Sequence, residues 1–242
     1  MTSSFDETRL TVVSENLKVI REGIAAAAVK SGRSPSDVRL MAVTKTVAPE
    51  LINYAITHCG VDLIGENKVQ EFLGKKDSLC LVGVEKHLIG HLQTNKVKKI
   101  ISEVDMIQSV DSFKLATVIS GEAAKAGVVA KVLLEINIGS ENSKTGFDKS
   151  AFFESLSAIS ELPNIEIKGL MTIPPICENE AELDGYFYNM QSYFEELKAL
   201  NYENFSMDIL SMGMSGDYIQ AILHGSNLVR VGSAIFGPRI YK

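Results

Sequence analysis

Tryptophan is absent from this sequence, cysteine is scarce, and long apolar runs are missing. The three cysteines, Cys59, Cys80 and Cys177, are scattered, and no CxxC pair occurs. An odd number of isolated cysteines argues against a disulfide framework and a thiolate metal site, and it fits a reducing compartment. No apolar run approaches the ~20 residues that a membrane-spanning helix requires. We therefore expect a cytoplasmic protein without a membrane partner.

An excess of positive charge is also missing. Lysine and arginine together number 24, against 30 aspartates and glutamates, so the net charge is −6. Such a balance disfavours a general role on nucleic acids or on anionic membrane surfaces. The segment Met1–Glu7 is polar and acidic, and it lacks the basic and apolar regions of a signal peptide. We expect neither export nor a nucleic-acid partner.

Proline, glycine and serine are nowhere concentrated into a linker, and the chain has no low-complexity tract. The chain has 242 residues, of which 45% are hydrophobic, so it is long enough for one large core. We therefore expect a single domain over residues 1–242.

Two long helices are expected from apolar residues that recur at spacings of three and four. In the first segment these residues are Leu10, Val13, Leu17, Ile20 and Ile24. Gly32 and Pro35 should end that helix. The longest later helix is expected over Glu178–Leu200, with apolar residues that we interpret as core packing. They are Leu183, Phe187, Met190, Phe194 and Leu197.

Short apolar runs alternate with helical sequence along the rest of the chain. The eight expected strands lie near Val38–Val43, Val61–Ile64, His87–Ile89, Met106–Val110, Val129–Ile136, Ile165–Met171, Met207–Leu210 and Leu228–Val231. Alternating strands and helices imply parallel strands joined by right-handed crossovers. Eight such units match a (β/α)8 TIM barrel preceded by an extra helix, and such barrels have ~250 residues. The alternative is an open doubly wound sheet, but no GxGxxG motif follows an early strand.

The loops after the last two expected strands have the composition of a phosphate site. In barrels these loops often bind phosphate through backbone N–H groups and the start of a short helix. The first reads Gly213-Met214-Ser215-Gly216, and the second begins with Gly232-Ser233. Glycines let the backbone approach an anion closely, and serine adds a hydroxyl donor. Each loop could serve its turn alone, but the two together indicate a phosphate site.

Lys45 closes the apolar run Leu40–Thr44, at the carboxyl end of the first expected strand. This is the end of a parallel strand at which α/β proteins place their chemistry. A primary amine there can condense with an aldehyde, and burial beside Arg230 would favour the neutral, nucleophilic amine. A lysine at a strand end is otherwise more often a surface or ion-pair residue. The two phosphate loops favour the binding role.

Three other side chains are candidates for contacts with such a ligand. Arg230 lies inside an apolar strand, where it is either half of an interior ion pair or a contact to a ring nitrogen of the ligand. Asn67 follows the second strand and could hydrogen-bond a ligand edge or cap the next helix. Met171 ends the sixth strand and is either the apolar floor of the pocket or plain core.

Histidine does not indicate a metal site. His87 and His91 are four residues apart, but strand and turn sequence lies between them. They are therefore not expected to share a helix face as metal ligands do.

Seven blocks of sequence, taken in order, resemble one known family. They are Ala42–Lys45, Gly65–Glu71, Ile89–Lys96, Ser143–Phe147, Gly169–Pro175, Ser211–Ser215 and Val229–Gly237. Through them the chain resembles the YggS/PROSC family of pyridoxal 5′-phosphate (PLP) homeostasis proteins over nearly its whole length. Lys68 departs from the pattern, because many members have an aromatic residue there.

The resemblance implies a fold-type III PLP barrel, similar to the N-terminal domain of alanine racemase. It implies that Lys45 carries PLP as a Schiff base, the internal aldimine, and that Arg230 faces the pyridine nitrogen. The residues it implies for the phosphate are Met214, through its backbone, Ser215, Gly232 and Ser233.

The same resemblance favours a carrier over an enzyme. An arginine at the ring nitrogen weakens PLP as an electron sink, because a guanidinium cannot accept the proton that a carboxylate would stabilise there. Racemisation also needs a second acid or base, which racemases of this type take from a C-terminal domain across a dimer. We expect no such domain here, and an open barrel mouth.

We therefore expect a monomeric PLP-binding protein without substantial turnover, and we assign no catalytic residue. It would hold PLP and could pass it to PLP-accepting apo-enzymes. One alternative is a slow, racemase-like PLP enzyme that acts on amino acids. The other is a barrel that binds a different phosphorylated metabolite without a covalent bond.

Overall fold

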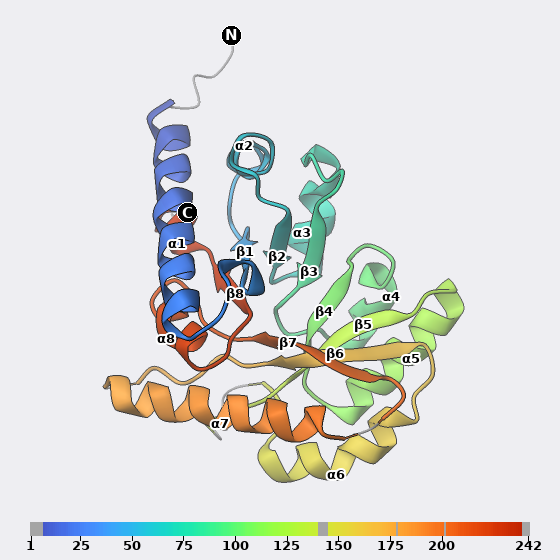
Figure 1. Ribbon diagram of the computed structural model, residues 1–242. Coiled ribbons are helices and arrows are strands. Elements are labelled where there is room, and N and C mark those ends of the chain that lie inside the picture. The colour runs from blue at the N-terminus through green and yellow to red at the C-terminus, as the bar shows by residue number, and fades with distance from the viewer. Residues whose placement is uncertain (1–6, 140–144, 178, 201, 239–242) are drawn as a thin grey trace.

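The computed structural model describes residues 7–139, 145–177, 179–200 and 202–238. Its centre is a closed barrel of eight parallel strands in sequence order, with β1 paired to β8 (Figure 1). The strands are β1 (Arg39–Val43), β2 (Leu63–Glu66), β3 (Glu85–Leu88), β4 (Met106–Val110), β5 (Ala130–Glu135), β6 (Ile165–Met171), β7 (Phe205–Ser211) and β8 (Leu228–Val231). Each overlaps an expected strand. The predicted (β/α)8 barrel is confirmed, and the open doubly wound alternative is wrong.

The helices surround the barrel. They are α1 (Glu7–Lys30), α2 (Pro49–Cys59), α3 (Val69–Lys75), α4 (Val97–Ile100), α5 (Phe113–Ala126), α6 (Lys149–Ser160), α7 (Glu180–Lys198), α8 (Tyr218–Leu223) and α9 (Ser233–Phe236). The expected helix over Glu178–Leu200 is α7, which begins two residues later because Asn179 caps it by accepting from the amide of Glu182 at 3.0 Å. Glu178 itself lies outside the described residues, as do Ser143 and Lys144 of the recognised blocks.

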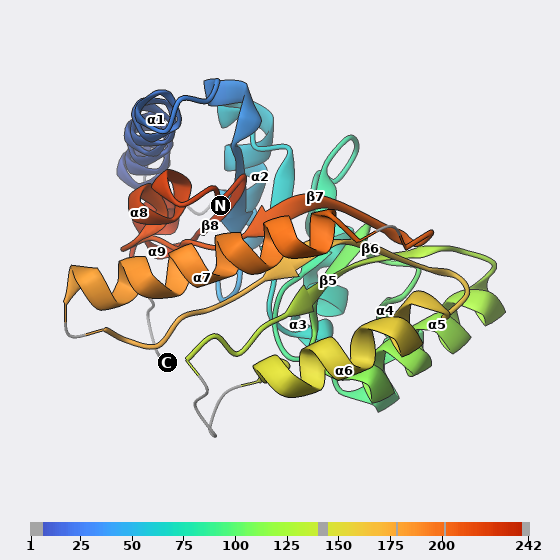
Figure 2. The same cartoon turned by 60° about the horizontal axis from the view of Figure 1, so that its bottom comes forward.

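Helix α1 precedes the first βα unit and packs beside the end of the barrel chain. Its apolar stripe is buried from Val13 to Ile24, as its spacing predicts, and Leu10 is partly buried. Figures 1 and 2 show α1 alongside α8, and α1 also contacts α9, so the first helix covers the last two. Gly32 follows it with φ 75°, a left-handed conformation that glycine adopts without strain. The two ends of the described chain therefore meet at the β8–β1 side of the barrel.

Strand residues alternate between the barrel interior and the surrounding helices. Outward residues such as Ala42 and Ile64 join the apolar face of α1 in a large buried cluster. Inward residues form two small apolar clusters that fill the barrel. They are Met41, Val43, Leu63, Ile89 and Leu228 in one, and Met106, Leu133 and Met171 in the other. The interior is thus packed with side chains, and it leaves room for a ligand at the strand ends.

Strands β6 and β7 approach each other closely at Gly169. Its φ is 149°, and a Cβ atom added there would lie 1.8 Å from the carbonyl oxygen of Ile209, its partner in the ladder. The register also shifts at this pair. Only glycine fits this position, so the block Gly169–Pro175 begins with a structural requirement.

Across the described residues, the structure has no helix with the length and apolar character needed to cross a bilayer.

Candidate functional site

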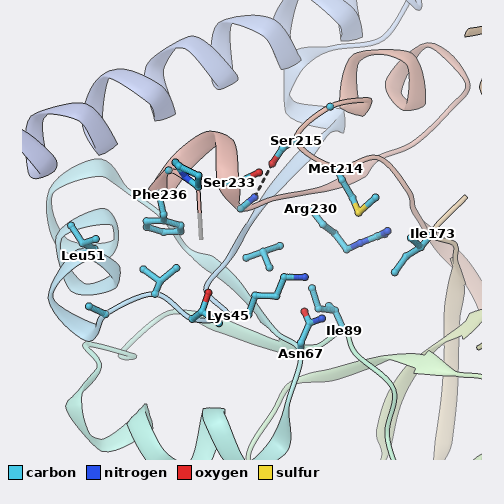
Figure 3. Close-up of a pocket in the computed structure, with 18 of the residues that line it drawn as sticks. Lys45, Leu51, Asn67, Ile89, Ile173, Met214, Ser215, Arg230, Ser233 and Phe236 are labelled. Carbon is cyan, nitrogen blue, oxygen red and sulfur yellow. Dashed lines mark hydrogen bonds between the residues drawn. The ribbon is translucent and has the colours of Figure 1, made fainter. Parts of the chain in front are cut away.

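A cavity of about 820 Å³ opens at the carboxyl ends of the strands. Its wall is built by residues that end or follow β1, β2, β3, β6, β7 and β8, together with the start of α2, the far end of α9 and Arg9 of α1. This volume is within the range of small-molecule sites. Figure 3 shows Lys45, Asn67 and Arg230 in the wall of this one space, with Ser215 and Ser233 beside them. The predicted candidates come from separate parts of the sequence, and the barrel brings most of them together.

Helix α3 holds the turn that carries Lys45. The ammonium group of Lys75 donates to the carbonyl oxygen of Thr44 at 2.8 Å, and a carboxylate oxygen of Glu71 accepts from the amide of Thr46. The residues before and after Lys45 are therefore both tied to one helix. Thr46 has φ 61°, which is uncommon for a β-branched residue. These contacts maintain a backbone conformation that the turn would not favour alone.

A buried carboxylate completes this arrangement. Glu66, at the end of β2, pairs with Lys75 and accepts from the hydroxyl of Thr44 at 2.7 Å. Its side chain is 1% exposed. Burial raises the pKa of Glu66, and the charge of Lys75 opposes that rise. The ion pair therefore stabilises a charge that the barrel would otherwise disfavour.

Replacing Lys75 with methionine should destabilise the protein, because it leaves Glu66 buried without its cation. We expect a loss of about 3 kcal/mol in the free energy of unfolding, measured in urea. Lys76→Met is the matched control, because Lys76 pairs with Glu103 at the surface, and its loss should change stability little. Equal losses in the two variants would contradict the role given to the buried pair.

Two loops meet at the predicted phosphate turns. The hydroxyl oxygen of Ser215, after β7, accepts from the amides of Gly232 and Ala234 at 3.3 and 3.2 Å (Figure 3). These amides open α9, whose N-cap is Gly232, as the sequence predicts. A Cβ atom on Gly232 would lie 3.2 Å from both Cβ and the carbonyl oxygen of Val43, so a larger residue would press on β1. The two turns therefore meet at one point, where a phosphate oxygen would have to replace Ser215 as the acceptor of these two amides.

Met214 also lines the cavity, but its amide already has a partner. It donates to a carboxylate oxygen of Asp217, and the carbonyl of Met214 accepts from the amide of Tyr218 at 2.9 Å. A phosphate oxygen would have to compete with Asp217 for the Met214 donor. Ser233 lines the cavity with an exposed side chain.

Arg230 is 3% exposed, and its side chain reaches the cavity from inside the barrel. One terminal nitrogen donates to the hydroxyl of Ser211 and the other to the carbonyl of Thr172, both at 2.7 Å. Both partners are neutral, so the expected alternative of an interior ion pair does not describe these contacts. Burial lowers the pKa of Arg230 to about 10, with Asp217 and Glu135 acting in the opposite direction. The guanidinium is therefore charged at neutral pH.

Asn67 has a buried side-chain oxygen without a hydrogen-bond partner, and it lines the cavity. The alternative role as a helix cap is wrong, because α3 begins at Val69 with Lys68 at its N-cap. Gly90 packs on this segment: a Cβ atom there would lie 2.3 Å from the carbonyl oxygen of Asn67. The free acceptor suits a hydroxyl or N–H group on a ligand.

Met171 does not line the cavity. Its side chain is fully buried with Met106 and Leu133, because the alternation of β6 turns it toward the barrel interior. The segment reaches the site through the next two residues. The carbonyl of Thr172 holds Arg230, and Ile173 lines the cavity.

The histidines do not form a metal site within the described residues, which contain no group of three suitable ligands. His91 pairs with Asp111 at 2.9 Å, whereas His87 points into the barrel.

Sequence reasoning missed the residues that support the site. Glu71, Lys75 and Ser211 act through contacts between distant segments, which no local pattern indicates. The place of Gly90 in the block Ile89–Lys96 could have indicated that a glycine is needed there. The cause of that need, close contact with the backbone of Asn67, is visible only in the fold.

The residues present fit the cofactor that the resemblance implies. Lys45 supplies a primary amine in the cavity wall, and the meeting loops bring together the hydroxyls of Ser215 and Ser233 and two amides that a phosphate would take over from Ser215. Asn67 offers an acceptor without a partner, and Arg230 offers a cation. A flat ring with a phosphate, a hydroxyl and an aldehyde has groups that match each of these.

Comparison with known proteins gives concordant matches. The family model of the alanine racemase N-terminal domain matches residues 16–239. The pyridoxal phosphate homeostasis protein of Aquifex aeolicus is 40% identical over 227 residues, covering 94% of this chain and 98% of the relative. That of Escherichia coli is 37% identical over 233 residues, covering 95% and 98%. The structure of PipY from Synechococcus elongatus, with PLP bound, aligns with a TM-score of 0.81 and 31% identity, covering 93% of this chain and 100% of PipY.

These matches span almost the whole of each chain, so they confirm the resemblance seen in the seven sequence blocks. The chain belongs to the family of pyridoxal phosphate homeostasis proteins, whose barrel is that of the alanine racemase N-terminal domain.

Proposed function

We propose that this chain is a cytoplasmic PLP-binding protein of vitamin B6 homeostasis, which holds the cofactor covalently through Lys45 without substantial turnover. One observation carries the proposal: a lysine amine, a buried guanidinium and the two phosphate-type turns border a single cavity. Membership of the homeostasis family and the PLP-bound structure of PipY support it.

Each residue has a distinct role in this proposal. Lys45 provides the nucleophilic amine, and α3 keeps its turn in place. Ser215, Gly232 and Ser233 hold the phosphate, and Met214 contributes if its amide leaves Asp217. Asn67 accepts from a polar group on the ring edge. When bound, PLP supplies an aldehyde for covalent attachment and a ring that can withdraw electrons.

Arg230 is the reason to propose that the protein binds PLP without catalysing a reaction on it. Its guanidinium keeps its protons at neutral pH, because even the lowered pKa is about 10. An arginine donates hydrogen bonds but cannot stabilise a protonated ring nitrogen as a carboxylate does. The residue that faces the ring therefore leaves the nitrogen largely without a proton, which weakens carbanion chemistry. Met171 is given no ligand contact, because Thr172 and Ile173, which follow it, are the residues of this segment that reach the site.

An absorbance titration with PLP tests the proposal. The purified protein should bind PLP with a shifted absorbance band and show no racemase, decarboxylase or transaminase activity on a panel of amino acids. Stereospecific exchange of an amino-acid α-proton in deuterated water would instead support the slow, racemase-like enzyme. Binding without any covalent adduct would support a non-covalent phosphate-ligand barrel.

Removing the phosphate from the ligand should weaken binding strongly. Pyridoxal keeps the aldehyde and the ring but cannot use the donors of the two turns. Charge-assisted hydrogen bonds of this kind correspond to roughly a hundredfold in affinity. Calorimetric titration of PLP and pyridoxal measures the ratio, and inorganic phosphate should compete with PLP. Equal affinities for the two vitamers would contradict the phosphate assignment.

We further propose that the protein is a monomer that passes PLP to acceptor apo-enzymes. Light scattering on eluted protein measures the mass of the particle. Transfer is measured by mixing loaded protein with an apo-enzyme and following the recovered activity. Activation at the rate of free PLP release would argue against direct transfer.

A further inference from the structure

A connected set of four polar side chains lies inside the described barrel, among the apolar clusters that fill it. The four are His87, Gln108, Ser211 and Arg230, and none is more than 3% exposed. Each lies two residues from a member of the interior apolar clusters, or from Ile209, which packs against them, and so faces the same side of the sheet. Buried polar groups are costly unless they are hydrogen-bonded. Each of the four should therefore have a hydrogen-bond partner inside the barrel.

The four side chains form one continuous hydrogen-bonded chain. Arg230 contacts the hydroxyl of Ser211 at 2.7 Å, and that hydroxyl contacts Oε1 of Gln108 at 2.8 Å. Nε2 of Gln108 lies 2.7 Å from Nδ1 of His87. Nε2 of His87 lies 2.6 Å from Oε1 of Glu85. The chain thus runs from the cavity wall on β8, through β7 and β4, to the first residue of β3.

The end at β3 is anionic. Glu85 also pairs with Arg39, the first residue of β1, at 2.8 Å. The hydrogen bond with His87 lowers the pKa of Glu85 to about 2, with a smaller contribution from Arg39 against the effect of burial. Glu85 is therefore a carboxylate at neutral pH. The chain has a cation at the cavity and an anion at the opposite end of the barrel.

The two ends, together with the orientation of the Gln108 amide, fix the direction of every hydrogen bond between them. A guanidinium can only donate, so the hydroxyl oxygen of Ser211 accepts from Arg230. A carboxylate can only accept, so Nε2 of His87 donates to Glu85. The amide nitrogen of Gln108 faces Nδ1 of His87 and can only donate, so Nδ1 accepts and the imidazole is neutral. The amide oxygen of Gln108 accepts the one hydrogen of Ser211.

We propose that Ser211, Gln108 and His87 are positioning residues for Arg230, and that the chain holds His87 as the neutral tautomer with its proton on Nε2. The part that concerns the cofactor rests on the proposed function, whereas the tautomer is a property of the protein alone. Since the hydrogen of Ser211 is committed to Gln108, a lone pair of its oxygen faces Arg230. Together with the carbonyl of Thr172, it fixes both terminal nitrogens of the guanidinium at the cavity.

The tautomer is measured by nitrogen NMR on the cofactor-free protein labelled at histidine. His87 should show one protonated and one unprotonated ring nitrogen, with the proton on Nε2. A proton on Nδ1, or on both nitrogens at neutral pH, would contradict the proposed direction of the hydrogen bonds. Gln108→Glu places a second carboxylate against Nδ1 and still accepts from Ser211. In this variant both ring nitrogens of His87 should be protonated, and an unchanged ring would also contradict that direction.

Coupling along the chain is measured in Ser211→Ala. Ser211 is linked to His87 through Gln108, and its removal frees Gln108 to turn, so the His87 ring signals should shift in the cofactor-free variant. Affinity for PLP should fall roughly tenfold, because a hydrogen bond to a charged group is lost. Ser211→Thr keeps the hydroxyl and should restore both readouts. Ser120→Ala is the matched control, because it removes a buried hydroxyl that donates to Pro163 outside the barrel.

The two hypotheses fail in different ways. If the wild-type protein binds no PLP, the proposed function fails. The His87 signals of the cofactor-free proteins still show whether the hydrogen-bonded chain of side chains exists. If the wild-type protein binds PLP but Ser211→Ala binds it equally well, the positioning role is wrong. If Ser211→Ala leaves the His87 signals where they are in Ser120→Ala, the residues are not coupled.

Discussion

Alanine at position 45 is expected to abolish covalent retention of PLP. The amine of Lys45 is the proposed attachment point in the cavity wall, and alanine leaves the phosphate turns and Arg230 in place. Residual binding should therefore persist through these contacts, with an affinity lower by about two orders of magnitude, or ~3 kcal/mol. Absorbance spectra after dialysis measure retention, and the shifted band should be missing in Lys45→Ala.

Lys68→Ala is the control for this result. Lys68 is an exposed lysine at the N-cap of α3, so it tests whether another nearby amine can attach PLP. It should retain PLP as the wild-type protein does. Retention by Lys45→Ala, or its loss in Lys68→Ala, would move the attachment point away from the β1 turn.

Gly169→Ala is expected to give the largest loss of stability. The added Cβ would lie 1.8 Å from the carbonyl oxygen of Ile209, and the backbone there has φ 149°. Neither β6 nor β7 can move without breaking its ladder, because both are strands of a closed barrel. We expect a loss of about 4 kcal/mol or failure to fold, measured by urea unfolding and by yield of soluble protein.

Gly185→Ala separates this effect from the general cost of replacing glycine. Gly185 is exposed in α7, and no atom lies within 4 Å of the position a Cβ would take. Alanine there should stabilise the helix by roughly 0.5–1 kcal/mol. A mild effect at both positions would mean that β6 and β7 do not approach as described.

The fold was largely predictable because its signals are local. The apolar stripe of α1 and the eight apolar runs each reflect burial of one face of an element, which leaves a period in the sequence. The closing of the sheet was predictable from the number and spacing of these units. Element boundaries were less so: β3 begins at Glu85, two residues before the expected start at His87, because its first two residues are charged and only partly buried and so leave no apolar signal.

The site was predictable where chemistry and turn composition coincide in the sequence. Lys45 and the turns at Ser215 and Gly232 have types and positions that suggest their roles without the fold. The role of Asn67 remained open between ligand contact and helix cap until the start of α3 was known. Met171 was ambiguous for another reason, since a residue that ends a strand can face the cavity or the interior beneath it.

The supports of the site could not be predicted from the sequence. Lys75 reads as an ordinary helical lysine, yet the barrel places it against Glu66 and the backbone before Lys45. Gln108 and His87 read as polar residues in apolar runs. Their partners come from other strands, so pairing appears only when the sheet closes. Contacts of this kind depend on register, which one sequence does not determine.

Borohydride reduction of the PLP-loaded protein, followed by peptide mass spectrometry, tests the central claim most directly. Reduction makes the attachment permanent and leaves a pyridoxyl group on the lysine that carried the vitamer. The account predicts this group on the peptide that contains Lys45 and at that residue alone when PLP is equimolar with protein. A pyridoxyl group on a different lysine, or none on a protein that has bound PLP, would contradict it.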